Sequence, residues 1–174
     1  IGFAVLVSVV SKLWFFTYNP YFELVELPLP YFGWIFFALG LIAGFFSLKA
    51  EWLSSKLKDF PSIILIVLLL GLPIFLMGIW VVKIAALLVL VQNVVRGYFE
   101  PFIQHFTHQY LNSENRATVM SIKSAIISLA HFAGLLIFSG MLNLYNLPAC
   151  LQLLGVFTLG VGALLIISYR RIFL

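Results

Sequence analysis

Four polar residues with a regular spacing interrupt one of the most apolar segments of the chain. Gln92, Arg96, Glu100 and Gln104 recur at every fourth position. Because an α-helix has 3.6 residues per turn, this spacing predicts one slowly winding polar stripe. A central charge costs a membrane helix roughly 2.5–3.5 kcal/mol, whereas an i,i+4 ion pair returns only about 0.2–0.5 kcal/mol. The difference favours a functional or interhelical role for Arg96 and Glu100 over the alternative, an intrahelical ion pair alone.

Polar residues share one face in two further apolar segments. These residues are Ser8, Ser11, Lys12 and Asn19 near the start, and Ser121, Ser124, Ser128 and His131 later in the chain. Polar side chains in membrane spans usually face protein or a water-filled cavity, so we expect the three faces to surround one polar interior. Alternatives stay open: the serines are equally suited to tight packing, His131 to a hydrogen-bonded packing role, and Lys12 to snorkelling.

The composition is that of an integral membrane protein. Hydrophobic residues make up 63% of the 174 residues, charged residues 9%, and the mean hydropathy is +1.13. A soluble domain would carry about 25% charged residues. The basic excess lies mostly in short loops, which suits membrane orientation and gives no reason to expect a nucleic-acid partner. The chain opens on Ile1 without a cleavable signal peptide, which suggests a fragment or a processed product.

Neither a metal site nor a cysteine cluster is expected. Cys150 is the single cysteine, which excludes an internal disulfide. His105 and His108 lack a third ligand at a useful spacing. We therefore expect no bound cofactor.

Six apolar runs are long enough to cross the hydrocarbon core, which takes roughly 20 residues as a helix. Helices are expected because lipid cannot satisfy exposed backbone groups. The predicted spans are about 1–18, 31–48, 60–80, 84–105, 117–142 and 148–168.

The basic residues between the spans predict the orientation. One side collects Lys49, Lys56, Lys58, Arg116, Arg170 and Arg171, and the other has only Lys83. The positive-inside rule places the basic side in the cytoplasm. We therefore expect a multi-pass protein of the cell membrane with both ends of this chain cytoplasmic.

The third and sixth spans have almost no polar side chains, and a helix that is apolar all round can face lipid, so we expect both spans outside the polar interior. In the second span, Gly33, Gly40 and Gly44 leave one side slim, which predicts close packing there.

Three stretches resemble the C-terminal six-helix half of a major facilitator superfamily transporter of the bacterial drug-efflux-like kind. The stretch "NSENRATVMSI" (112–122) is similar to the opening of the eleventh helix in that family, and "RGYFEP" (96–101) is similar to the Gly-x-x-x-Pro kink of the tenth. The stretch "NPYF" (19–22), with the prolines that follow, resembles the connection from the seventh helix to the eighth. The basic loop after the second span departs from the family pattern, because it lacks the Asp-Arg pair and the second glycine.

The resemblance implies an all-α integral membrane fold, with residues 1–174 forming one half-bundle. It implies an alternating-access secondary transporter that moves a small molecule. Proton-coupled efflux is the expected activity, and uptake of another solute is an alternative. The expected partners are the lipid bilayer, the substrate, and either an N-terminal half absent from this chain or a second copy.

The family architecture and the polar faces together assign candidate residues. Glu100 is the candidate for proton coupling, because a carboxyl in a weakly hydrated site can hold a proton near neutral pH. Gly97 and Pro101 are the expected helix kink, and Arg116 is expected to hold the cytoplasmic loop. The candidates for lining the substrate cavity are Lys12, Phe15, Tyr18, Asn19, Gln92, Asn93, Arg96, Ser128 and His131.

Other functional classes fit the sequence less well. An aquaporin would need two Asn-Pro-Ala elements, a rhomboid protease a Gly-x-Ser nucleophile with a partner histidine, and a mitochondrial carrier three internal repeats. No enzyme is expected. A non-transporting six-helix scaffold stays an alternative, and it predicts that Gln92, Arg96 and Glu100 can all be made apolar without loss of function.

Overall fold

The described part of the chain is entirely helical. The structure is a computed structural model that describes the backbone of residues 2–57, 59–110 and 113–173, and the side chains there except 54–55, 104–116 and 169–173. Its elements, in chain order, are α1 (Gly2–Phe16), α2 (Tyr18–Leu24), α3 (Leu29–Leu48), α4 (Ala50–Lys56), α5 (Asp59–Ile79), the 3-10 helix η1 (Lys83–Leu88), α6 (Val89–Tyr110), α7 (Ser113–Leu144) and α8 (Leu147–Phe173).

The helices have the length and apolar character of membrane spans. Within the described ranges, five helices satisfy both requirements, and α1 with α2 makes a sixth span if the pair is counted as one bent helix. An all-α membrane fold was predicted and is confirmed at this level. The short helix α4 and the 3-10 turn η1 were not predicted.

The first span is longer than predicted because the chain bends and continues. Thr17 separates α1 from α2, which meet at an angle of 41°. Its backbone N–H and its Oγ1 both donate to the Trp14 carbonyl, at 2.9 and 2.7 Å, so the turn is tightened to an i−3 pattern there. Pro20, which lacks an N–H donor, follows in the first turn of α2. The helix therefore reaches Leu24 instead of ending near residue 18.

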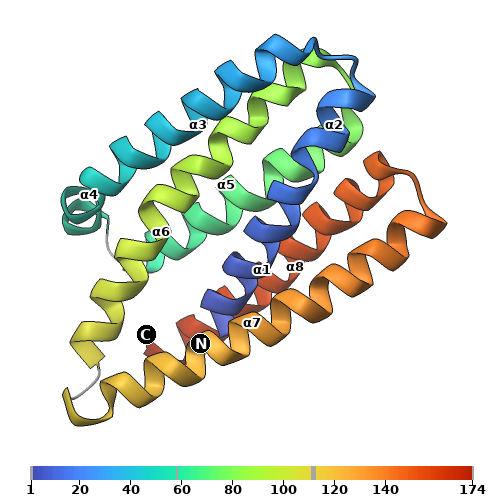
Figure 1. Ribbon diagram of the computed structural model, residues 1–174. Helices are drawn as coiled ribbons and strands as arrows, with labels where there is room; N and C mark the ends of the chain where they lie inside the picture. Colours follow the sequence, from blue (N-terminus) through green and yellow to red (C-terminus); the bar gives the residue numbers. More distant parts are fainter. Residues whose placement is uncertain (1, 58, 111–112, 174) are drawn as a thin grey trace.

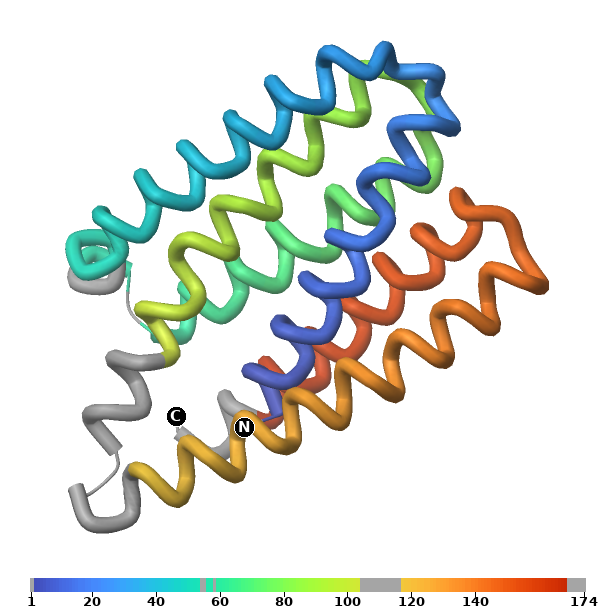
Figure 2. The backbone as a smooth tube through the Cα atoms, in the orientation of Figure 1, coloured from blue at the N-terminus to red at the C-terminus, as the bar shows by residue number. Residues whose placement is uncertain are grey.

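The helices pack as neighbouring pairs around α1. Helix α3 lies along α6, α5 lies along α8, and α7 lies along α1, which also contacts α5, α6 and α8 (Figure 1). The tube in Figure 2 shows α1 running between α6 on one side and α7 on the other. This placement puts the polar face of α1 between the two other helices that carry polar residues.

Other helices cover more of the third span, α5, than its uniformly apolar composition indicates. In the apolar core of α5, 56% of the residues are buried, against 6% in α3 and 6% in α7. Helix α5 is buried because glycines let α8 approach it: a Cβ added at Gly155 would lie 2.7 Å from the backbone N of Phe75, and one at Gly78 would lie 2.6 Å from the carbonyl of Pro148. An apolar surface can be covered by another helix as well as by lipid, and hydropathy does not separate the two.

The close packing predicted at the glycines of α3 is not found in the described structure. A Cβ added at Gly33, Gly40 or Gly44 would meet nothing within 4 Å. The glycine that brings α3 and α6 together is Gly97 of α6, where an added Cβ would clash with the carbonyl oxygen of Ala43.

Both described ends of the chain lie at the same end of the bundle. The start of α1, the end of α8 and the basic helix α4 share this end, and the turns from α2 to α3 and from α7 to α8 lie at the other (Figure 1). Helix α8 begins after Asn146, whose Oδ1 accepts the Ala149 N–H at 3.0 Å as an N-cap. The arrangement agrees with an even number of spans, and the compartment that each end faces stays a prediction.

Candidate functional site: a polar cavity between three helices

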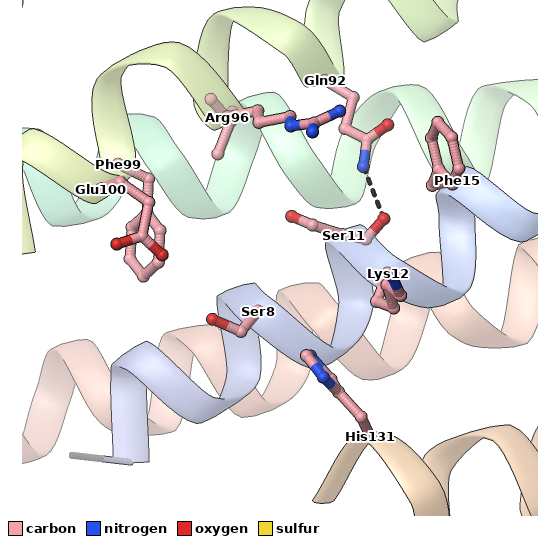
Figure 3. Close-up of a pocket in the computed structure, with 10 residues that line it drawn as sticks. Ser8, Ser11, Lys12, Phe15, Gln92, Arg96, Phe99, Glu100 and His131 are labelled. Carbon is pink, nitrogen blue, oxygen red and sulfur yellow. Dashed lines mark hydrogen bonds between the residues drawn. The ribbon is translucent and has the colours of Figure 1, made fainter. Parts of the chain in front are cut away.

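A cavity of about 390 Å³ lies between α1, α6 and α7. Each of the three helices with a predicted polar face contributes to it, and no residue of α5 or α8 whose side chain the structure describes lines it. The lining residues are Ser8, Ser11, Lys12 and Phe15 from α1, Gln92, Val95, Arg96, Phe99 and Glu100 from α6, and His131 from α7 (Figure 3).

The spacing on α6 explains how five of its residues reach one cavity. Positions 92, 95, 96, 99 and 100 are three and four residues apart, so they lie on the same side of the helix. Packing on the opposite side fixes this orientation, because the backbone at Gly97 lies against α3. The cavity face of α6 is therefore set by the contact of its other face.

Gln92 connects α6 to α1 at the cavity wall. Its Nε2 donates a hydrogen bond of 2.6 Å to the carbonyl oxygen of Ser11 (Figure 3). The side chain is only 2% exposed, and its Oε1 has no hydrogen-bond partner. The Nε2 of His131, also buried, lacks a partner as well. Buried polar atoms usually have partners, so two unpaired atoms on one cavity wall are unusual.

The charges on the cavity wall are not neutralised in pairs. Arg96 and Glu100 form no ion pair within the described structure, so the alternative of an intrahelical ion pair is not what the structure shows. Figure 3 shows the Arg96 guanidinium turned toward Gln92, and the Glu100 carboxylate turned away beside Phe99. Lys12 has its Nζ 5.3 Å from the centre of the Phe16 ring, a cation–π contact. Among the described lining residues, two cations and one carboxylate therefore face the same space.

Tyr18 and Asn93, two of the predicted lining residues, are buried beside the cavity instead. Their side chains are 0% and 3% exposed, and both donate to the carbonyl oxygen of Val89, at 3.4 Å each. The bond from Tyr18 connects α2 to the start of α6, whereas the bond from Asn93 lies within α6. Tyr18 is off the cavity wall because the bend at Thr17 directs α2 toward the η1–α6 junction.

The remaining candidates are distributed differently from the prediction. Asn19 and Ser128 are exposed and do not line the cavity. Helix α6 continues through Gly97 and Pro101 as one element, and Gly97 serves the contact with α3. The side chain of Arg116 lies outside the described residues, as do those of Gln104, His105 and His108.

Two apolar lining residues were not singled out from the sequence. Val95 and Phe99 flank the charged positions of α6 and share their face. Val95 and Phe99 follow Gln92 by three and seven residues, and this helical spacing could have identified them. Apolar residues are abundant in a span, however, so spacing alone could not separate lining residues from packing residues.

The cavity is suited to binding a small amphiphilic molecule. It combines fixed charges, amide and hydroxyl groups with the rings of Phe15 and Phe99, and binding sites for small molecules have volumes of about 300–1,000 Å³. Among the described residues, no group of three or more His, Cys, Asp or Glu side chains is placed to hold a metal ion.

No protein-family profile, curated protein or solved structure matches the chain. The resemblance to the major facilitator superfamily therefore stays a hypothesis carried by the stretches that suggested it.

Proposed function

We propose that this chain is one half of a secondary active transporter that moves a small amphiphilic molecule across a membrane. The observation that carries the proposal is the convergence of polar side chains from three otherwise apolar helices on a single cavity. A span that carries charged residues is costly to insert, and such residues usually mark a substrate or ion pathway.

The arrangement of the helices supports alternating access. The cavity lies between α1 with α7 on one side and α6 with α3 on the other, so relative movement of these pairs would change its opening. Helices α5 and α8 hold the bundle together from outside the cavity through their glycine contacts. In this proposal the second wall of the conduit is supplied by another six-helix bundle, either a further part of the same protein or a second copy.

Glu100 is the proposed proton-coupling residue. It lines the cavity and lacks an ion-pair partner within the described structure, and carboxylates within membrane spans commonly belong to proton relays. Glu100→Gln removes that proton site while keeping the size and polarity of the side chain. We expect this variant to lose proton-driven transport in vesicles but to keep exchange of substrate, and unchanged coupling would exclude Glu100.

Alternating access can be tested without knowing the substrate. A single cysteine is placed in the cavity by Ser8→Cys, in a background where the native cysteine is removed by Cys150→Ala. The full gene product is reconstituted in liposomes, and a membrane-impermeant maleimide is added to either side. We expect labelling from both sides, in proportions that shift when a pH gradient is imposed.

The matched control is Leu68→Cys, on the exposed apolar surface of α5, where a charged reagent has no water-filled route. This residue should stay unlabelled from both sides. A non-transporting scaffold predicts that Ser8→Cys is labelled from one side at most and is insensitive to the gradient. That result would overturn the proposed function.

A further inference from the structure

We propose that the cavity selects an organic monoanion: a small amphiphile that carries one carboxylate, an apolar body and a hydrogen-bond donor such as a hydroxyl. This inference rests on the proposed function and adds the chemical class of the substrate. It is argued from the charge balance of the cavity wall and from one buried atom that lacks a partner.

The two cations are available to a ligand. Arg96 has no hydrogen-bond or ion-pair partner within the described structure, and the Nζ of Lys12 lies over the Phe16 ring with no ion pair among the described residues. A guanidinium presents N–H donors in a planar fork that matches a carboxylate, so Arg96 can bind one through two parallel hydrogen bonds. Lys12 adds a second positive charge from the facing helix.

The single carboxylate on the wall does not reverse this preference. Glu100 lies one helical turn from Arg96, and its side chain is directed away from the guanidinium (Figure 3). Lys12 and Arg96 outnumber it among the described lining residues, and the charge of arginine is permanent at any physiological pH. An anionic ligand that lies beside Arg96 is therefore favoured over a cationic one.

The position of the hydrogen-bond donor follows from Gln92. Its amide is held by the bond from Nε2 to the Ser11 carbonyl, so the free Oε1 is fixed in place on the same wall as Arg96. Leaving a buried acceptor without a partner costs about 1–3 kcal/mol. A ligand hydroxyl or N–H at this position would remove the cost.

The apolar body fits the rest of the wall. Phe15, Val95 and Phe99 line the cavity between the polar groups. A volume of about 390 Å³ accommodates an aromatic ring with short substituents. The lining therefore fits a hydroxylated aryl carboxylate.

Two commercially available probes separate the charge classes. 4-Hydroxyphenylacetate and tyramine share a hydroxylated ring and differ mainly in carrying a carboxylate or an ammonium group. Binding to the full gene product in detergent is measured by isothermal titration calorimetry at neutral pH. We expect the anion to bind at least tenfold more tightly than the cation, and phenylacetate, which lacks the hydroxyl, to bind several-fold more weakly than 4-hydroxyphenylacetate.

Variants then locate the anion. Arg96→Gln should lower the affinity for 4-hydroxyphenylacetate by about tenfold or more without weakening tyramine, and Arg96→Lys should restore part of the loss. Lys83→Gln is the matched control, because Lys83 is an exposed cation in η1, away from the cavity lining, and the affinity should be unchanged. The comparison of the two probes on the unmodified protein holds even if a variant fails to fold.

Binding of neither probe, or equal or tighter binding of tyramine, would overturn the anion proposal. The cysteine-labelling experiment uses no ligand, so its outcome is independent of this one. Two-sided labelling with a preference for tyramine would therefore remove the substrate class and leave the transporter proposal standing.

Discussion

At the residue scale, the few polar side chains of the spans fall into two groups with different partners. One group joins helices: the Ser62 and Tyr98 hydroxyls are 2.9 Å apart between α5 and α6, and Gln152 donates to the carbonyl of Gly78 at 2.7 Å. Interhelical hydrogen bonds in membranes contribute on average about 0.6 kcal/mol. The other group, with Arg96 and Glu100, lines the cavity and forms no ion pair within the described structure. Gln92 belongs to both groups, because it lines the cavity and bonds to the Ser11 carbonyl.

The end of α2 offers a test of local backbone energetics. Glu26 has a φ of 52°, in the left-handed region that favours glycine. Its N–H donates to Glu23 at 3.0 Å and the next N–H, of Leu27, donates to Phe22 at 2.9 Å, which together form a Schellman motif. Glu26→Gly should therefore stabilise the protein by up to about 1 kcal/mol, seen as a higher midpoint of thermal unfolding in detergent.

The control for this substitution is Glu23→Gly, an exposed position inside the same helix, where glycine is unfavourable by about 0.5–1 kcal/mol. The two substitutions remove the same charge and should shift the midpoint in opposite directions. A lower midpoint for Glu26→Gly would show that the carboxylate, and not the backbone, dominates at this turn.

At the element scale, the strongest association is between α5 and α8, and glycine makes it possible. At Gly155 and Gly78 the backbones of the two helices come into contact, and at Gly71 and Gly162 the space next to the glycine is filled by the side chains of Leu159 and Val67. Lipid is as apolar as leucine, so such close packing, and not hydrophobicity, drives helices together in a membrane. The pair is thus suited to stay fixed while the helices around the cavity move.

Adding one methyl group at this contact should disrupt it. A Cβ at position 155 would lie 2.7–2.8 Å from backbone atoms of Phe75, which cannot move without displacing α5. Gly155→Ala should destabilise the protein by about 1–3 kcal/mol, measured by thermal or denaturant unfolding in detergent. Gly160→Ala is the matched control on the same helix: it meets nothing within 4 Å and should be neutral or slightly stabilising.

The glycines also show what the sequence could and could not predict. The apolar helices, five or six depending on how the bent pair α1 and α2 is counted, and the polar faces of α1 and α6 followed from run length and helical spacing, because both depend only on local sequence. The contacts of α5 and of Gly97 did not follow, because a helix that faces lipid and one that faces another apolar helix have the same composition. Which candidates would line the cavity also depended on the bend at Thr17, which takes Tyr18 off its wall.

At the scale of the whole molecule, charge separates the two ends of the bundle. Lys49 precedes α4 and Lys56 ends it, at the end of the bundle that also holds the described termini, and Lys83 lies in η1, which follows α5. The exposed rings of Trp34 and Trp80 lie in the opposite half, in the positions expected for an interfacial aromatic belt.

The positive-inside rule turns this asymmetry into an orientation that can be measured. Lys56→Cys and Lys83→Cys each place one exposed thiol at an opposite end of the bundle, again with Cys150→Ala. In intact cells, an impermeant maleimide should label Lys83→Cys at once and Lys56→Cys only after permeabilisation, because the basic end is retained in the cytoplasm. Leu70→Cys, fully buried, should stay unlabelled in both conditions and reports that the fold is intact. The reverse labelling pattern would place α4 outside and would invert the direction from which a cytoplasmic solute first meets Arg96.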